Sequence, residues 1–196
     1  MTNDVFNVCY INKITMNTYI ALLRGINVSG HKMIKMEDLK RVLAETGFTG
    51  LKTYIQSGNI IFRSGQADPA RLCAEIAAKI LEHFGFEVPV VIRTREELES
   101  VSKNNPFLPG KPDESAKLHV TFLSDVAAND LENRIMEVSF LPDEFVIKGK
   151  EVYLYCPNGY GNTKLTNQLF ESRLKVTATT RNWKTVETLV KMTSDE

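Results

Sequence analysis

The stretch TYIALLRGINVSGHKMIKMEDLKRVLAETGFTGLKTYIQSGNIIFR (Thr18–Arg63) decides the fold of this chain. Short apolar runs at Thr18–Leu23, Leu51–Ile55 and Asn59–Arg63 predict strands, while apolar residues recur at helical spacing over Lys35–Thr46. The polar, glycine-bearing turn between the last two strands predicts a hairpin. This one stretch therefore predicts the order strand, helix, strand, strand.

The pattern continues along the chain and then repeats. Asp68-Pro69 predicts the start of a second helix, because Asp is a good N-cap and Pro suits the first turn. A strand at Val88–Ile92 and a short helix with a capping box at Thr94 complete the first half. The second half repeats this order, with strands at 117–123, 144–147, 151–155 and 176–180 and helices at 129–138, 163–174 and 183–192.

The repetition predicts the fold class. Each half has the order β-α-β-β-α-β followed by a helix, which is the order of the ferredoxin-like split βαβ unit. We therefore predict an α+β protein of two tandem ferredoxin-like (βαββαβ) halves, with antiparallel sheets covered by helices. The predicted organisation is an extension at 1–15, an N-terminal half at 16–103, a proline-rich linker at 104–116 and a C-terminal half at 117–196.

Composition places the chain among ordinary globular proteins. Its 196 residues carry a formal net charge of zero, and 43% of them are hydrophobic. The cysteines Cys9, Cys73 and Cys156 are far apart, which favours reduced thiols and a cytoplasmic location. Because no apolar run approaches the length of a membrane span and the histidines are scattered, we predict no membrane association, no metal and no cofactor.

The loop Arg24–Gly30 leads from the first strand towards a helix, where many α/β proteins bind an anion. Its glycines have the spacing of a phosphate loop, but His31 displaces the lysine by one position and Met33 replaces the hydroxyl, so a nucleotide triphosphatase is disfavoured. Arg24 and Asn27 remain candidates for binding a carboxylate or phosphate. In the alternative interpretation, the loop is a tight connection whose glycines supply positive φ.

Further candidate ligand-binding residues lie in three more polar segments. Ser57 and Asn59 belong to the hairpin turn, which lacks the G-x-S-x-G setting of a hydrolase nucleophile. Lys164 follows a glycine-rich loop, and Arg181 and Asn182 precede the last helix. Each also has a structural interpretation, namely a turn for the first pair, a surface loop for Lys164, an ion pair for Arg181 and a helix N-cap for Asn182.

Four runs resemble a known bacterial family, domain-of-unknown-function family 1697: ALLRGINV (21–28), YIQSGNIIF (54–62), KLTN (164–167) and ATTRNW (178–183). The resemblance extends from about Met16 to about Met192. It implies a cytosolic α+β protein of ferredoxin-like character. The family carries no established activity, so the resemblance transfers no catalytic residues. Its signatures coincide with these polar loops, which suggests a site there.

The leading functional hypothesis is binding of a small anionic ligand, a nucleotide or a phosphorylated metabolite, between the two halves. Arg24, Asn27, Lys164 and Arg181 would supply charge and hydrogen bonds. A second hypothesis is single-stranded nucleic-acid binding through exposed aromatics of the sheets, which the zero net charge disfavours. A third is an enzyme whose acid and base come from different loops, and a fourth is an assembly role through sheet edges. The oligomeric state stays open.

Overall fold

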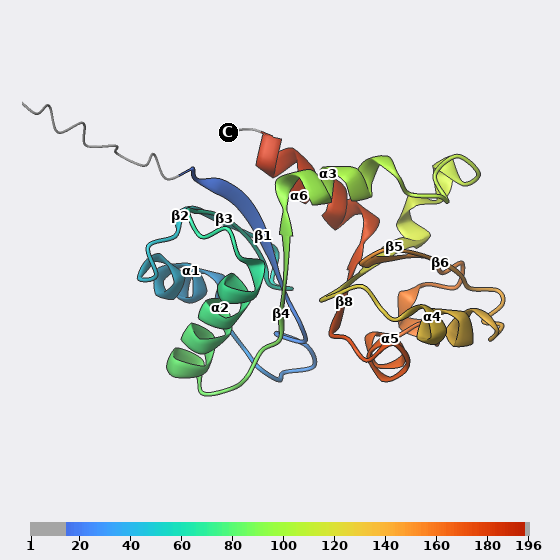
Figure 1. Cartoon of the computed structure of the whole chain (residues 1–196), viewed down its shortest axis with the longest axis horizontal. Coiled ribbons are helices and arrows are strands. Elements are labelled where there is room, and N and C mark those ends of the chain that lie inside the picture. The colour runs from blue at the N-terminus through green and yellow to red at the C-terminus, as the bar shows by residue number, and fades with distance from the viewer. Residues whose placement is uncertain (1–14, 195–196) are drawn as a thin grey trace, which may run out of the picture.

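The computed structural model describes residues 15–194, which form two similar halves (Figure 1). The first half contains β1 (Asn17–Leu23), α1 (Met36–Ala44), β2 (Thr49–Tyr54), β3 (Asn59–Ser64), α2 (Pro69–Phe84), β4 (Val90–Thr94) and α3 (Arg95–Lys103). The second half contains β5 (Leu118–Leu123), α4 (Asn129–Met136), β6 (Glu144–Lys148), β7 (Glu151–Tyr155), α5 (Asn167–Leu174), β8 (Ala178–Asn182) and α6 (Trp183–Ser194). Short 3-10 helices lie at Pro112–Lys117 and Tyr160–Asn162.

Each half is built on a four-stranded antiparallel sheet. The strand orders are β2-β3-β1-β4 and β6-β7-β5-β8, so the first strand of each half lies in the centre of its sheet. In each half, this central strand pairs antiparallel with the second strand of the hairpin on one side and with the last strand on the other. The predicted α+β class with two βαββαβ halves is confirmed.

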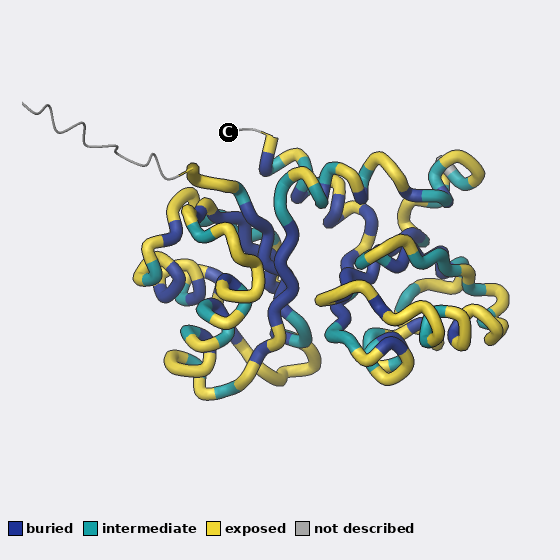
Figure 2. Tube along the Cα trace, viewed as in Figure 1, coloured by how far each residue is buried: buried dark blue, intermediate teal, exposed yellow. Residues whose placement is uncertain are grey.

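Three hydrophobic cores hold the layers together. The helices α1 and α2 cover the outer face of the first sheet, and α4 and α5 cover the outer face of the second (Figure 1). The inner faces of both sheets share a central core with α3 and α6, which includes Trp183 at 1% exposure. Figure 2 shows the buried strands in the middle of the molecule and the exposed outer surfaces of the helices. The two halves therefore fold around a common centre.

Local capping signals act as the sequence predicts. The side chain of Asp68 accepts a hydrogen bond from Ala70 N at the start of α2. Thr94 forms a full capping box with Glu97, because Thr94 Oγ1 accepts from Glu97 N (3.2 Å) and Glu97 Oε2 accepts from Thr94 N (2.9 Å). This box starts α3 directly after β4 and so directs α3 onto the central core.

The segment predicted to be a linker (104–116) is more ordered than a free spacer. Phe107 belongs to the central core, and Asn105, two residues before it, is also buried. The segment also contains most of the 3-10 helix Pro112–Lys117, whose first residue is one of the three prolines. Proline disfavours a helix interior but fits a first helical turn, where its missing N–H costs nothing. The connection thus packs the halves together.

Several boundaries differ from the sequence-based expectation. The strand expected at Val88–Ile92 is β4 (Val90–Thr94), and the helix expected from Thr163 begins only at Asn167, capped by Thr166. Thr163 delays the helix because its hydroxyl donates to Asp143 Oδ2 and accepts from Leu165 N, which holds extended backbone. Leu81 and Val138, which helical spacing places on the apolar faces of the helices predicted after Asp68 and over 129–138, are 46% and 42% exposed, and Val138 lies beyond the end of α4 at Met136.

Three further expectations concern the start of the chain, membranes and metals. The predicted extension at 1–15 lies, apart from its last residue, outside the described residues. No helix within residues 15–194 is both long enough and apolar enough to cross a membrane. In the same range, no group of three or more His, Cys, Asp or Glu side chains is arranged to hold a metal ion.

Candidate functional site

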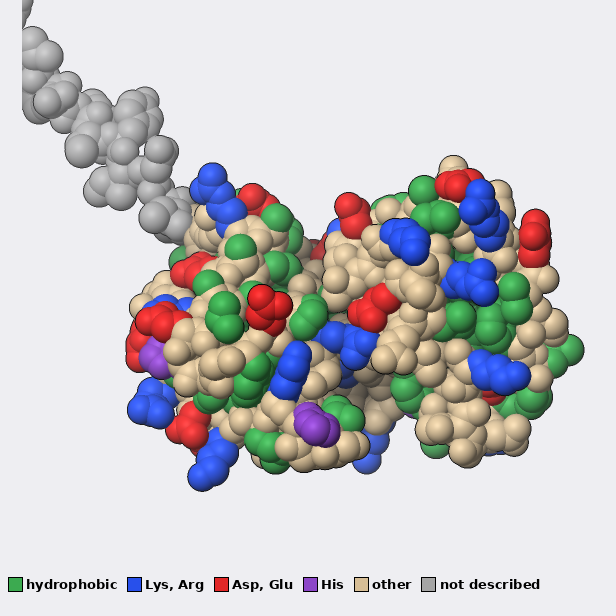
Figure 3. All heavy atoms as spheres, turned by 90° about the horizontal axis from the view of Figure 1, so that it is seen from below, with side chains coloured by type: hydrophobic (Ala, Val, Ile, Leu, Met, Phe, Trp, Pro, Cys, Tyr) green, Lys and Arg blue, Asp and Glu red, His purple; other side chains and the backbone are tan. Residues whose placement is uncertain are grey.

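A cleft of about 590 Å³ lies where the end of β1, the β2–β3 turn, β8 and α5 come together. Seen from below, the surface is hollowed between the two halves, and Lys and Arg side chains gather near the hollow (Figure 3). Both halves contribute to the cleft, which is lined by Leu23, Arg24, Gly25, Ile26, Val28, Ser29, His31, Ser57, Tyr160, Asn167, Thr179, Thr180 and Arg181. Neither half by itself could form it.

The loop between β1 and α1 is held in shape by Asn27. Its Oδ1 accepts a hydrogen bond from Ile34 N (2.8 Å), and its Nδ2 donates to the carbonyl oxygens of Ile34 (2.9 Å) and Gln56 (2.7 Å). Asn27 has a positive φ of 54°, a conformation that asparagine tolerates better than most residues. Asn27 thus ties the loop to the β2–β3 turn beside the cleft, and its direct contact with a ligand stays a prediction.

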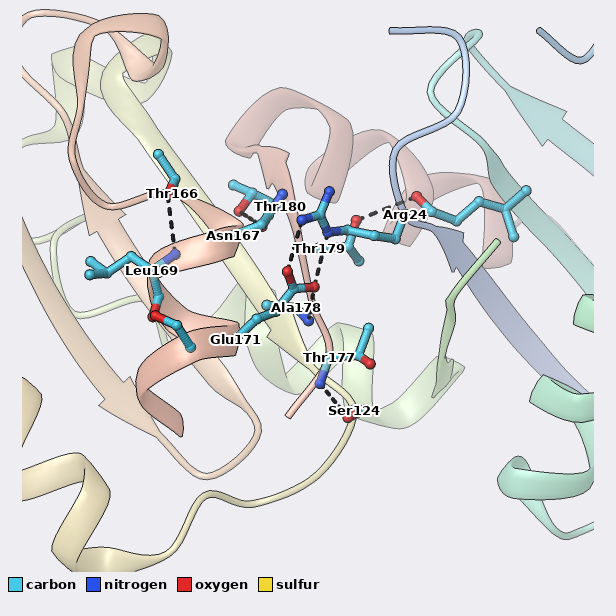
Figure 4. A network of polar contacts seen from close by, with 12 residues as sticks. Arg24, Ser124, Thr166, Asn167, Leu169, Glu171, Thr177, Ala178, Thr179 and Thr180 are labelled. Carbon is cyan, nitrogen blue, oxygen red and sulfur yellow. Dashed lines mark hydrogen bonds and ion pairs between the residues drawn. The ribbon is translucent and has the colours of Figure 1, made fainter. Parts of the chain in front are cut away.

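Arg24 and Glu171 form an ion pair that joins the two halves (Figure 4). Arg24 Nε donates to Glu171 Oε1 (3.0 Å) and Arg24 Nη2 donates to Oε2 (2.8 Å), while Ala178 N also donates to Oε1 (3.1 Å). Burial opposes ionisation of Glu171, but the hydrogen bonds from Arg24 and Ala178 outweigh it and lower the pKa of the carboxyl group. The pair is therefore charged at neutral pH.

This ion pair leaves much of the Arg24 side chain available. A guanidinium group has five N–H donors, and the two bonds to Glu171 use two of them. Within the described part of the chain, the remaining three N–H groups have no acceptor. Arg24 is held in a fixed orientation by Glu171 and can still donate hydrogen bonds to a group that enters the cleft.

Arg181 is buried in the wall of the cleft, at 7% exposure. It projects from β8 into the first half and donates only to neutral oxygens: Asn59 Oδ1 (2.5 Å), Leu23 O (2.8 Å), Thr179 Oγ1 (2.8 Å), Thr180 O (2.9 Å), Ser57 O (3.0 Å) and Gly58 O (3.4 Å). No carboxylate among residues 15–194 pairs with it, so the ion pair considered for Arg181 is not formed.

The charge of Arg181 is consequently unbalanced. Burial lowers the pKa of its guanidinium group to about 10, which still leaves the group charged at neutral pH. A buried charge without a counter-ion is costly, and proteins normally pair such a charge or bind an ion beside it. Arg181 therefore contributes a positive electrostatic potential to the cleft, although its own N–H donors are occupied.

Ser57 and Asn59 have different positions at this site. Asn59 is fully buried, and its Nδ2 donates to Tyr54 O (2.9 Å) and Ser57 Oγ (3.0 Å) while its Oδ1 accepts from Arg181. Ser57 is half-buried and lines the cleft. Its hydroxyl hydrogen has no acceptor among the described residues, so Ser57 can donate to a ligand, whereas Asn59 supports the wall behind it.

A set of hydroxyl groups forms another wall of the cleft. Tyr160 OH donates to Thr180 Oγ1 (3.0 Å), and Thr180 Oγ1 donates to Asn167 Oδ1 (2.7 Å). The ring of Tyr160 stacks on His119 with a centroid distance of 4.8 Å. Burial raises the pKa of the Tyr160 hydroxyl, so it stays protonated at neutral pH. This wall is polar but carries no charge of its own.

Two of the residues predicted to bind a ligand lie elsewhere. Lys164 lines a separate hollow beside Asp143 and Asn162, and it does not reach the cleft. Asn182 caps α6, since its Oδ1 accepts a hydrogen bond from Thr185 N (2.8 Å), which is the structural role considered for it from the sequence. Of the candidate residues, the structure therefore brings Arg24, Ser57 and Arg181 together at the cleft.

Some residues at the cleft were not predicted from the sequence as ligand contacts. Tyr160 lies in the glycine-rich loop before Lys164, and Asn167 is the last residue of the KLTN run, whereas Glu171 is an ordinary polar position of α5. Nothing in the local pattern marks Glu171, which lies 147 residues after its partner Arg24. Only the packing of the two halves brings these side chains together.

Comparisons with known proteins agree with this fold. The conserved bacterial protein SP0830 from Streptococcus pneumoniae has a similar solved structure, with a TM-score of 0.70 and 24% sequence identity over 91% of this chain and 99% of that one. At this identity, the similarity concerns the fold. No curated protein matches the chain. The family model described as a protein of unknown function, DUF1697, matches residues 16–153. The chain therefore belongs to the DUF1697 family.

Proposed function

We propose that the cleft between the two halves binds a small metabolite that carries a carboxylate or phosphate group. The observation that carries this proposal is the buried guanidinium group of Arg181, which has neutral hydrogen-bond acceptors and no carboxylate among the described residues. The charges of Arg24 and Glu171 balance each other. The charge of Arg181 therefore leaves the surroundings of the cleft net positive. An entering anion would balance that charge.

The two arginines would act differently on such an anion. Arg24 would donate hydrogen bonds directly, because Glu171 orients it and leaves three of its N–H groups without an acceptor among the described residues. Arg181 would act through its charge, because its donors already have acceptors. Bonds that involve charged groups are stronger than neutral ones, and burial reduces screening by solvent. Together, the arginines favour an anion over a neutral ligand.

The size and lining of the cleft fit a small molecule. Its volume of about 590 Å³ lies within the range of roughly 300–1,000 Å³ that is usual for small-molecule sites. Apolar side chains from the β1 end and the following loop line one part, and the hydroxyl groups of Ser57, Tyr160 and Thr180 line another. This lining suits a ligand with an anionic group attached to a partly polar body.

The burial of the sheet aromatics favours the anion site over the nucleic-acid hypothesis. That hypothesis relied on Tyr54, Phe62, Tyr153 and Tyr155 as exposed stacking platforms. Tyr54 is partly buried against the central core, and the other three side chains are 0%, 3% and 9% exposed. Phe62 belongs to the outer core of the first half, and Tyr153 and Tyr155 belong to the central core. An enzymatic reaction remains compatible with an anion site, but no arrangement of acid and base among the described residues of the cleft favours a particular one.

The proposal predicts a specific effect of Arg24→Gln. The substitution removes the charge and the available donors of Arg24, so we expect the affinity for the anion to fall at least about tenfold. Native mass spectrometry of gently purified protein would identify any retained ligand, and calorimetric titration with inorganic phosphate, sulfate and citrate would measure affinity. Arg41→Gln is the matched control, because Arg41 lies on α1 with its side chain 75% exposed.

Two results would contradict the proposed function. One is the absence of any retained ligand together with no measurable binding of the three anions to the wild-type protein. The second is an equal affinity for an anion in wild type, Arg24→Gln and Arg41→Gln. Circular dichroism of each variant establishes that a loss of binding does not reflect unfolding.

A further inference from the structure

A second buried arginine makes several contacts that correspond to those of Arg181, but in the opposite direction between the halves. Arg93 in β4 is 1% exposed and reaches into the second half. Its Nη2 donates to the carbonyl oxygens of Leu123 (2.7 Å) and Lys150 (3.0 Å), and its Nη1 donates to the carbonyl of Ile92 (2.8 Å). Its Nε donates to Glu151 Oε1 (2.8 Å). We call this set of contacts the Arg93 clasp and the contacts of Arg181 the Arg181 clasp.

The two clasps correspond position by position. Each Nη2 donates to the carbonyl of the last residue of the opposite half's central strand, Leu123 for Arg93 and Leu23 for Arg181. Each Nη1 donates to the carbonyl of the preceding residue in its own strand. Each Nε donates to the first residue of the opposite half's hairpin strand, β7 or β3. These three contacts match in position, and the acceptor of Nε differs in charge. Arg181 donates in addition to Thr179 Oγ1 and Ser57 O.

That difference is one of charge. Glu151, which accepts from Arg93, is a carboxylate, so the Arg93 clasp contains its own counter-ion. Asn59, which accepts from Arg181, is a neutral amide in the corresponding place. Strand register supports the correspondence, because Asn59 pairs with Leu22 in β1 and Glu151 pairs with Phe122 in β5. Leu22 and Phe122 each immediately precede the last residue of their central strand.

We propose that Asn59 determines the selectivity of the cleft for anions, because it leaves the charge of Arg181 to be balanced by a bound phosphate or carboxylate group. This inference rests on the proposed function of the cleft. Asn59 is fully buried and does not line the cleft, so it acts through Arg181 and does not touch the ligand. A carboxylate at position 59 would balance Arg181 from within, as Glu151 balances Arg93.

The test compares Asn59→Asp with Asn59→Ala in the full-length protein. Both variants lose the bonds that the Asn59 amide donates to Tyr54 and Ser57, but only aspartate adds a negative charge beside Arg181. In calorimetric titrations with inorganic phosphate, we expect Asn59→Asp to lower affinity at least about tenfold, since a unit charge near a buried group acts at low effective dielectric. Asn59→Ala is expected to stay within about threefold of wild type, because it leaves the charge of Arg181 unbalanced.

A converse variant keeps the test decisive if Asn59→Asp does not fold. Glu151→Gln removes the counter-ion of Arg93. Glu151 lines a hollow of about 350 Å³ together with Lys148, Lys150 and Glu97, of which Lys150 and Glu97 pair with each other. We expect this variant to bind one more phosphate than wild type. If Asn59→Asp folds, an affinity for phosphate equal to that of wild type overturns the inference. If Asn59→Asp is unfolded, an unchanged number of bound phosphates in Glu151→Gln overturns it. If wild type binds no anion, the proposed function itself fails.

Discussion

Replacing Gly58 with alanine is expected to destabilise the protein by about 3 kcal/mol, from roughly 1–3 kcal/mol of overpacking and about 1 kcal/mol of backbone strain. Gly58 has a positive φ of 73°, and a Cβ added there would lie 2.7 Å from both Leu23 Cβ and Ile26 Cδ1. The first of these atoms is rigidly attached to β1, so it cannot move aside easily. Because Gly58 O also accepts from Leu23 N and Arg181, the damage is expected to reach the cleft.

Gly149→Ala provides the matched control. Gly149 lies in the corresponding turn of the second half with a φ of 60°, but no atom lies within 4 Å of the position its Cβ would take. Only the backbone strain remains, so we expect a loss of about 1 kcal/mol. Urea unfolding followed by the fluorescence of Trp183 would measure both variants. Equal losses in the two would show that the contact with Leu23 and Ile26 has no energetic weight.

Glu151→Ala is expected to lower the free energy of unfolding by about 3 kcal/mol. Removal of one partner of a buried ion pair leaves the second charge uncompensated, which costs roughly 3–5 kcal/mol. The expected value lies at the lower end of this range because the side chain of Glu151 is 17% exposed while that of Arg93 is 1% exposed. Arg93 keeps its three backbone acceptors, so the loss falls on the charge of its guanidinium group.

The measurement is again urea unfolding, with Glu96→Ala as the control because Glu96 lies in the first turn of α3 and outside the Arg93 clasp. We expect the control to change stability by no more than about 0.5 kcal/mol. A loss in Glu151→Ala as small as in the control would mean that solvent or neighbouring groups screen Arg93 completely. It would also weaken the comparison between the Arg93 clasp and the Arg181 clasp, since that comparison depends on the counter-ion.

Local patterns predicted most of the fold. The alternation of apolar runs with helical stripes located each strand and helix, because burial of one face requires side chains at fixed spacing. Capping residues such as Asp68 and Thr94 marked helix starts, since their side chains satisfy free backbone N–H groups nearby. The predicted start of α5 was wrong, because the bond from Thr163 to Asp143 connects residues 20 positions apart.

The candidate site was predicted only in part. Arg24, Ser57 and Arg181 were candidates as polar residues in loops or at strand ends, and they do line one cleft. The sequence also suggested Lys164, which lies at a different hollow, because basic character alone says nothing of where a loop is placed. Glu171 carried no signal, because an acidic residue on a helix is usually a solvated charge.

The sequence by itself therefore determined the two-fold repetition, the order of the elements and the apolar faces that build each core. These properties depend on side-chain spacing and capping over a few residues. Only the tertiary structure decided that the inner faces of both sheets share a core, that Arg24 meets Glu171 and that Arg181 lacks the counter-ion that Arg93 possesses. Charge balance is a property of groups close in space, and here those groups come from opposite halves of the chain.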